Sequence, residues 1–110
     1  MVSLFLDDER FPPEKGEWSI VRSYEEAVQY CIDNGCPSYA SFDHDLGDNS
    51  PTGYDFAKWL VESDMEDEGG FIPSDFSFYV HSQNPVGAKN IQMYLDGYLD
   101  FKRKGNGKKE

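Results

Sequence analysis

Cysteine and positive charge are both scarce in this sequence, and each shortage argues against a class of protein. The two cysteines, Cys31 and Cys36, have the spacing of neither a CxxC redox pair nor a zinc-binding pair. We therefore expect reduced thiols in a cytoplasmic protein. No apolar run reaches the ~20 residues that a membrane-spanning helix needs, and the first residues lack the basic start of a signal peptide. Neither a membrane protein nor a secreted protein is expected.

Negative charge dominates, because 10 Lys and Arg residues face 21 Asp and Glu residues and leave a net charge of −11. This imbalance argues against broad binding to duplex nucleic acid, whose phosphates attract positive side chains. The length fits one domain, which we expect over residues 1–101. Five of the ten cations fall in the last ten residues, so residues 102–110 are expected to form a basic, disordered tail. Solvation of that tail is favoured over contact with RNA, and the sequence leaves the oligomeric state open.

Four short apolar runs alternate with segments of helical periodicity. The expected strands are residues 2–6, 18–21, 39–42 and 76–80. Helices are expected to begin after the N-cap residues Ser23, Thr52 and Asn84. This alternation predicts a largely parallel α/β sheet that is covered on both faces. The first connection is an exception, because Pro12, Pro13 and Gly16 make it a loop. The acidic segment 64–70 is expected to be a solvated connection.

Aspartates follow the first and third expected strands, where Asp7, Asp8 and Asp43 stand. The carboxyl ends of neighbouring parallel strands meet at one edge of a sheet, which is the usual ligand site in open α/β folds. Two carboxylates about 4 Å apart repel by about 4 kcal/mol at an effective dielectric constant of about 20. A converging cluster therefore needs a cation or raised pKa values. Oxygen ligands select a hard ion such as Mg²⁺, Mn²⁺ or Ca²⁺; the alternative is a set of solvated acids.

Both histidines also follow expected strands. His81 follows the fourth strand beside Ser82, and His44 follows the third strand between two aspartates. Histidine titrates near neutral pH and is the usual proton carrier in catalysis, so both are candidate catalytic residues. The alternative for His44 is that it only orients a carboxylate. Ser82, Asn84 and the free amides of the last helix are candidate phosphate ligands, although the two side chains also suit a purely capping role.

Cations near the expected site are few. Arg10 follows the first acidic cluster, Arg22 ends the second strand, and Lys89 falls in the first turns of the last helix. A net-negative protein that binds an anion needs local positive charge, which a metal ion and such side chains supply together. Arg10 and Lys89 are therefore candidate phosphate-binding residues, and an ordinary solvated side chain is the alternative for each.

Four motifs occur in a characteristic order along the chain. They are Leu6-Asp7-Asp8-Glu9-Arg10 with Pro12-Pro13, Ser41-Phe42-Asp43-His44-Asp45-Leu46-Gly47, Thr52-Gly53-Tyr54-Asp55 and His81-Ser82-Gln83-Asn84-Pro85-Val86-Gly87. In these motifs the sequence resembles the cyclic-phosphate processing receiver-like domain family, which is related to response-regulator receiver domains. The resemblance implies a small receiver-like (flavodoxin-like) three-layer fold. Its mostly parallel four-stranded sheet would have the order 2-1-3-4, with a loop as the first crossover and no fifth strand.

The resemblance also implies roles for the site residues. Asp7, Asp8 and Asp43 would hold Mg²⁺ or Mn²⁺, and Ser82 matches the hydroxyl position after the fourth strand. The expected function is a metal-dependent phosphoesterase that acts on a cyclic phosphate, so the expected partner is a small phosphorylated ligand or an RNA end. One alternative is a non-catalytic module that binds a phosphorylated nucleotide or a protein. Another is a receiver that accepts a phosphoryl group on Asp43, which the missing fifth-strand lysine disfavours.

Overall fold

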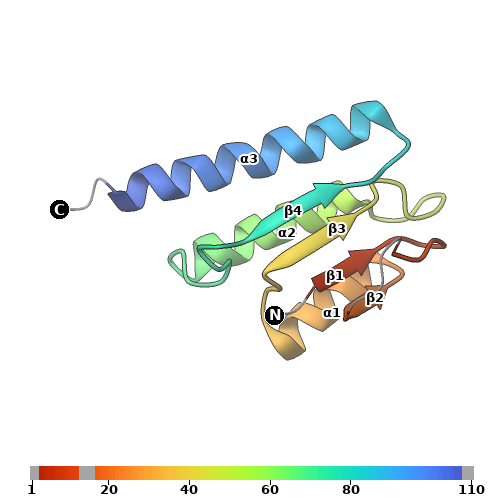
Figure 1. The fold of residues 1–110 in the computed structure, drawn as a ribbon, viewed down its shortest axis with the longest axis horizontal. Coiled ribbons are helices and arrows are strands. Elements are labelled where there is room, and N and C mark those ends of the chain that lie inside the picture. Colours follow the sequence, from red (N-terminus) through yellow and green to blue (C-terminus); the bar gives the residue numbers. More distant parts are fainter. Residues whose placement is uncertain (1–2, 13–16, 108–110) are drawn as a thin grey trace.

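Four parallel strands form one sheet in the order β2-β1-β3-β4, as the sequence predicts (Figure 1). The computed structural model describes residues 3–12 and 17–107, with side chains through residue 104. Its elements are β1 (Ser3–Leu6), β2 (Trp18–Val21), α1 (Tyr24–Asn34), β3 (Tyr39–Phe42), α2 (Gly53–Glu66), β4 (Ser77–Val80) and α3 (Pro85–Gly107). No described helix is both long and apolar enough to cross a membrane.

The four strands end in register at one edge of the sheet. Leu6 pairs with Val21 on one side and with Phe42 on the other, and Phe42 pairs with Val80. Because these four residues are the last of their strands, the residue that follows each strand lies at the same edge. The pairing of the strands therefore brings residues 7, 22, 43 and 81 to one edge, although they are far apart in the sequence.

Helices α1 and α2 lie behind the sheet in Figure 1, and α3 runs alongside β4, where its buried residues join the same core. The connections from β2 to β3 and from β3 to β4 step across the sheet in the same direction, and right-handed crossovers then place α1 and α2 on one side. Helix α1 contacts α2, and α2 contacts α3. The strands contribute Leu4, Leu6, Ala40 and Phe42 to the buried core beneath these helices, and the helices contribute residues that include Phe56, Leu60, Ile91 and Leu95.

The opposite face of the sheet differs from the expectation of a third layer. It carries alternate residues of the strands, including Phe5, Trp18, Ser41 and Tyr79, and no helix in the described part of the chain packs on it. The step from β1 to β2 runs in the other direction, so a helix in that crossover would lie on this face. The described residues of the crossover form no helix. In the described residues, the receiver-like strand order is thus built from one layer of strands and one layer of helices. We call the surface of the sheet that these helices leave uncovered the open face.

Helix α3 continues past the point where a disordered tail was expected. It runs to Gly107, and both the half-buried Lys102 and the exposed Arg103 contact the loop before β4; residues 108–110 are outside the described range. The ammonium of Lys102 lies 3.1 Å from the carboxylate of Asp64 and donates to the carbonyl of Ile72 at 2.8 Å. Arg103 donates to the carbonyl of Phe76 at 3.3 Å. These contacts explain why the helix persists through the basic segment.

Asp64 is fully buried, although the sequence suggested a solvated segment there. Its carboxylate accepts hydrogen bonds from the amides of Phe71 (2.9 Å) and Ile72 (2.7 Å) and from the hydroxyl of Tyr98 (2.6 Å). Burial alone raises the pKa of a carboxyl group, but these bonds and the charge of Lys102 together hold the pKa of Asp64 below its usual value. One ionised side chain therefore fastens α2, the following loop and α3 together.

The variant Asp64→Asn should lose about 3–5 kcal/mol of unfolding free energy, because it leaves the Lys102 ammonium buried without its counter-charge. The exposed neighbour Glu66 supplies the matched control, Glu66→Gln, which should stay within about 0.5 kcal/mol of the parent. Both are measured by urea denaturation.

The effect should also depend on pH. The folded-state pKa of Asp64 is lowered, so its contribution is complete above the unfolded value of about 3.9 and is lost as the pH falls through the folded value. The difference between the parent and Asp64→Asn should therefore shrink below about pH 4. A difference that stays constant down to acid unfolding would show that ionised Asp64 is not the source of the stability.

Candidate metal and phosphate site

Three carboxylates meet at the carboxyl edge of the sheet. Asp7, Asp8 and Asp43 each have an oxygen atom within 4.8 Å of the others, a spacing that allows one cation to be shared. Asp7 and Asp43 are buried, whereas Asp8 is exposed. The convergence follows from the strand register, since Leu6 and Phe42 pair directly before Asp7 and Asp43. The all-oxygen donor set suits Mg²⁺ or Mn²⁺.

Asp7 is the most heavily hydrogen-bonded of the three. One of its oxygens accepts from the amides of Glu9 and Arg10, both at 2.9 Å. Its other oxygen lies 3.2 Å from the Arg10 Nε atom and 3.0 Å from Nε2 of His81. Burial raises the pKa of this carboxyl, but the amides, His81 and the Arg10 charge outweigh burial and lower the pKa overall. Asp7 is therefore held as an anion at the base of the site.

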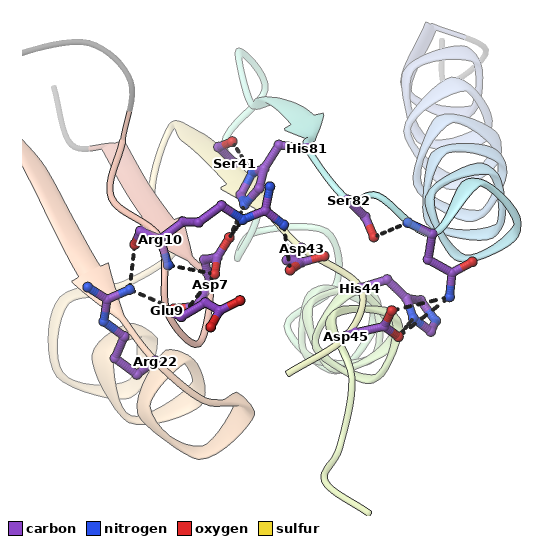
Figure 2. A network of polar contacts seen from close by, with 11 residues as sticks. Asp7, Glu9, Arg10, Arg22, Ser41, Asp43, His44, Asp45, His81 and Ser82 are labelled. Carbon is purple, nitrogen blue, oxygen red and sulfur yellow. Dashed lines mark hydrogen bonds and ion pairs between the residues drawn. The ribbon is translucent and has the colours of Figure 1, made fainter. Parts of the chain in front are cut away.

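Two arginines, Arg10 and Arg22, lie beside Asp7 at this edge (Figure 2). The Arg10 guanidinium bridges Asp7 and Asp43, with its Nη2 atom 3.2 Å from Asp43, and its side chain is 41% exposed. Arg22 donates to the backbone carbonyls of Asp7 and Arg10 and so fixes the loop that follows β1. The sequence singled out Arg22, like Arg10, as a possible source of local positive charge, but Arg22 was not among the predicted phosphate ligands. The strand register places the position directly after β2 at the same edge, and there Arg22 holds the loop through backbone carbonyls.

His81 connects the cluster to the open face of the sheet. Its Nε2 contacts Asp7, its Nδ1 lies 2.8 Å from the hydroxyl of Ser41, and its ring stacks on Phe5 with centroids 4.7 Å apart. Ser41 was not among the predicted site residues. Strand alternation offered a signal for it, because Ser41 precedes Asp43 by two positions. The imidazole is thus fixed by hydrogen bonds at both nitrogens and by a ring on one side.

His44 points toward the start of α3 and away from Asp7 (Figure 2). Its Nδ1 lies 2.9 Å from Asp45, and this hydrogen bond lowers the pKa of Asp45. The ring packs against Gly87 so closely that any side chain at that position would collide with it. Asp45 also accepts a hydrogen bond from the side-chain nitrogen (Nδ2) of Asn84 at 3.4 Å. In this arrangement His44 joins the loop after β3 to α3, and its catalytic role stays a prediction.

The predicted phosphate ligands after β4 mainly cap α3. The Ser82 hydroxyl accepts from the amide of Asn84, and the Asn84 side chain accepts from the amide of Gly87, both at 3.0 Å. A pocket of about 390 Å³ lies over the cluster, and its lining residues are Asp8, Glu9, Arg10, Asp43, Asp45, Gly47, Asp48 and Gln83. Gln83 was not predicted for the site, and Lys89 is exposed on α3 outside this lining. Phosphate binding by Ser82, Asn84 and Lys89 stays a prediction.

The variant Asp43→Asn should bind Mn²⁺ at least about tenfold more weakly than the parent in isothermal titration calorimetry. It removes the charge of one of the three clustered carboxylates. Asp48→Asn is the matched control, because Asp48 lines the pocket but is not one of those three. Arg10→Gln should bind Mn²⁺ more tightly, since the guanidinium competes with a cation for Asp7 and Asp43. Equal affinities in all four proteins would remove the cluster as a metal site.

Comparison with known proteins adds a family to this geometry. No curated protein and no solved structure matched the chain. The profile of one family, described as the cyclic-phosphate processing receiver domain, matches residues 2–97. The match spans the whole sheet, α1, α2 and the first half of α3, and it includes all three clustered carboxylates and both histidines. The chain belongs to the cyclic-phosphate processing receiver domain family.

Proposed function

We propose that this domain is a metal-dependent phosphoesterase that opens a cyclic phosphate on an RNA end or a nucleotide. The observation that carries the proposal is the meeting of three carboxylates, an arginine and a histidine at one edge of the sheet. The family description supplies the cyclic phosphate. Cleavage of a phosphate ester needs compensation of negative charge and a proton for the leaving oxygen. The groups at this edge are of the types that meet these two needs.

Asp7, Asp8 and Asp43 are the residues that would hold Mg²⁺ or Mn²⁺. Such an ion neutralises charge on a bound phosphate and lowers the pKa of a coordinated water. The buried pair, Asp7 and Asp43, offers fixed oxygens, and the exposed Asp8 adds a carboxylate that solvent can reach. This mixture of fixed and accessible oxygens suits Mg²⁺, which keeps several water ligands when it binds to proteins.

Arg10 gives the pocket its positive charge. It lines the pocket, is partly exposed, and is held toward the cluster by Asp7 and Asp43. A guanidinium donates two parallel hydrogen bonds to phosphate oxygens. Arg22 keeps Arg10 in place through its bond to the Arg10 carbonyl. In a chain with a net charge of −11, this local cation allows an anion to approach an acidic edge.

His81 is the proposed proton carrier. Ring opening joins a water oxygen to phosphorus, releases a proton from that water and breaks one ester bond, whose leaving oxygen takes up a proton. A positioned imidazole is the usual carrier of such protons in catalysis. Asp7 and Ser41 hold the imidazole in one orientation, which lets it pass a proton without a search for the correct geometry. His44 is a less direct candidate because it faces α3.

A non-catalytic binding module is the second candidate, and one observation favours it. Both nitrogens of His81 already have partners within the protein, and Arg10 is bridged between two carboxylates. A histidine held in this way can serve as a rigid support for Asp7 and need not exchange protons with a ligand. In that case the edge would bind a phosphorylated nucleotide without converting it.

The deciding assay is hydrolysis of 2′,3′-cyclic AMP and of RNA with a 2′,3′-cyclic phosphate end in the presence of Mn²⁺. The parent should convert at least one of them, and His81→Ala should lower the rate about 100-fold or more, as expected for loss of a general acid or base. Asp43→Asn should be equally impaired, whereas Asp48→Asn should retain the parent rate. Tight binding of the cyclic nucleotide by the parent without any product would establish the binding module instead.

A further inference from the structure

The open face of the sheet contains a cavity of about 650 Å³. This volume falls within the range of small-molecule sites, which are mostly apolar with a few polar groups. Its lining residues are Ser3, Phe5, Trp18, Ser38, Tyr39, Ser41, Asp75, Ser77, Tyr79 and His81. Its lining combines aromatic side chains with serines, and it includes His81.

Parallel sheets are normally covered on both faces, because their strands are apolar on both sides. Here the second face has no cover from the described helices, yet Tyr79 is 59% exposed and Ile20 is 39% exposed on it. Nothing in the packing of the core requires these side chains, since the core lies on the other side of the sheet. Exposed apolar side chains on an uncovered face of this kind are typical of interaction sites.

Ring contacts connect the cavity to the candidate metal site. Tyr39 lies against Trp18 at 6.0 Å between centroids, and Trp18 lies against Phe5 at 5.8 Å. Phe5 in turn stacks under His81, whose Nε2 contacts Asp7. The same histidine thus lines the cavity and contacts the carboxylate cluster. A ligand with one part in the cavity and another part at the carboxylate cluster would contact His81 at the point where the two parts join.

The chemistry of the cavity selects its occupant. Among the described lining residues there is no lysine or arginine, and Asp75 is an acid. This disfavours an anionic group in the cavity itself. A neutral planar ring is favoured, because it can stack on Trp18 or Tyr79 and hydrogen-bond to the serines through its edge. Proteins bind unpaired bases in this way, by stacking them on aromatic side chains that an uncovered sheet presents.

We infer that the open face holds the base of the nucleoside whose cyclic phosphate lies at Arg10 and the carboxylate cluster. The inference rests on the proposed function and adds the part of the substrate that the edge does not bind. The phosphate meets the positive charge of Arg10, and the uncharged base meets the aromatic cavity. The net charge of −11 repels a long polyanion, which favours a single nucleotide over the end of an RNA.

Trp18 provides a direct probe of the cavity. The sequence contains two tryptophans, so the variant Trp59→Phe leaves Trp18 as the only fluorophore of this kind. Adenosine should quench its fluorescence saturably, and ribose alone should not. Adding Tyr79→Ala should weaken adenosine binding about tenfold, as expected for loss of one stacking partner. Phe101→Ala is the control, because Phe101 is an exposed ring on α3 that does not line the cavity.

Two results would overturn the inference. The first is no quenching by adenosine, uridine, cytidine or guanosine at millimolar concentration in a protein that still binds Mn²⁺. The second is a dimer in analytical ultracentrifugation that Tyr79→Ala dissociates, because the open face would then be an interface between two copies of the chain.

The failure of this inference can be told apart from failure of the proposed function. Adenosine has no phosphate, so quenching does not depend on hydrolysis and should persist in Asp43→Asn. Turnover by the parent with an unchanged KM in Tyr79→Ala would reject the base site alone. Adenosine binding without turnover would reject the phosphoesterase alone.

Discussion

The buried carboxylate of Asp7 is the group around which the candidate site is organised. Four donors satisfy it: the amides of Glu9 and Arg10, the Arg10 side chain and His81. An ionised group that is removed from water needs such partners, because its desolvation would otherwise be very costly. The same four contacts fold the loop after β1 back on itself and tie it to the end of β4. Arg10 and His81 therefore take their positions from the requirement to satisfy Asp7.

Local sequence signals predicted the elements and the edge well, because they depend on residues that are close together in the chain. The alternation of apolar runs with helical periodicity, together with the N-cap residues, predicted the strands and helices. The positions of Asp7 and Asp43 directly after two strands predicted that their carboxylates lie close together. Asp64 was missed because its partners are remote: Ile72 lies 8 positions away and Lys102 lies 38 positions away. The same pairing explains the extended α3. The open face was missed because strand patterns report an apolar side chain without reporting what covers it.

The two sides of the sheet differ in what they contact. The helix-covered side contains the core, and the Asp64 network closes it at the far end of α2 and α3. No helix among the described residues covers the open side, and the buried core cluster lies on the other side of the sheet. The charged groups of the candidate site lie at the carboxyl edge between the two. The helix core and the candidate site thus occupy different parts of the domain, so substitutions in one need not disturb the other.

The position of His81 has a thermodynamic consequence. One ring nitrogen contacts Asp7 in the carboxylate cluster, and the other contacts Ser41 on the open face. A molecule bound on the open face that shifted this ring would alter the environment of Asp7, and a cation bound at Asp7 would alter the ring. If both bind, linkage requires each to change the binding free energy of the other by the same amount. The two contacts of one imidazole would then couple occupancy of the open face to occupancy of the carboxylate cluster.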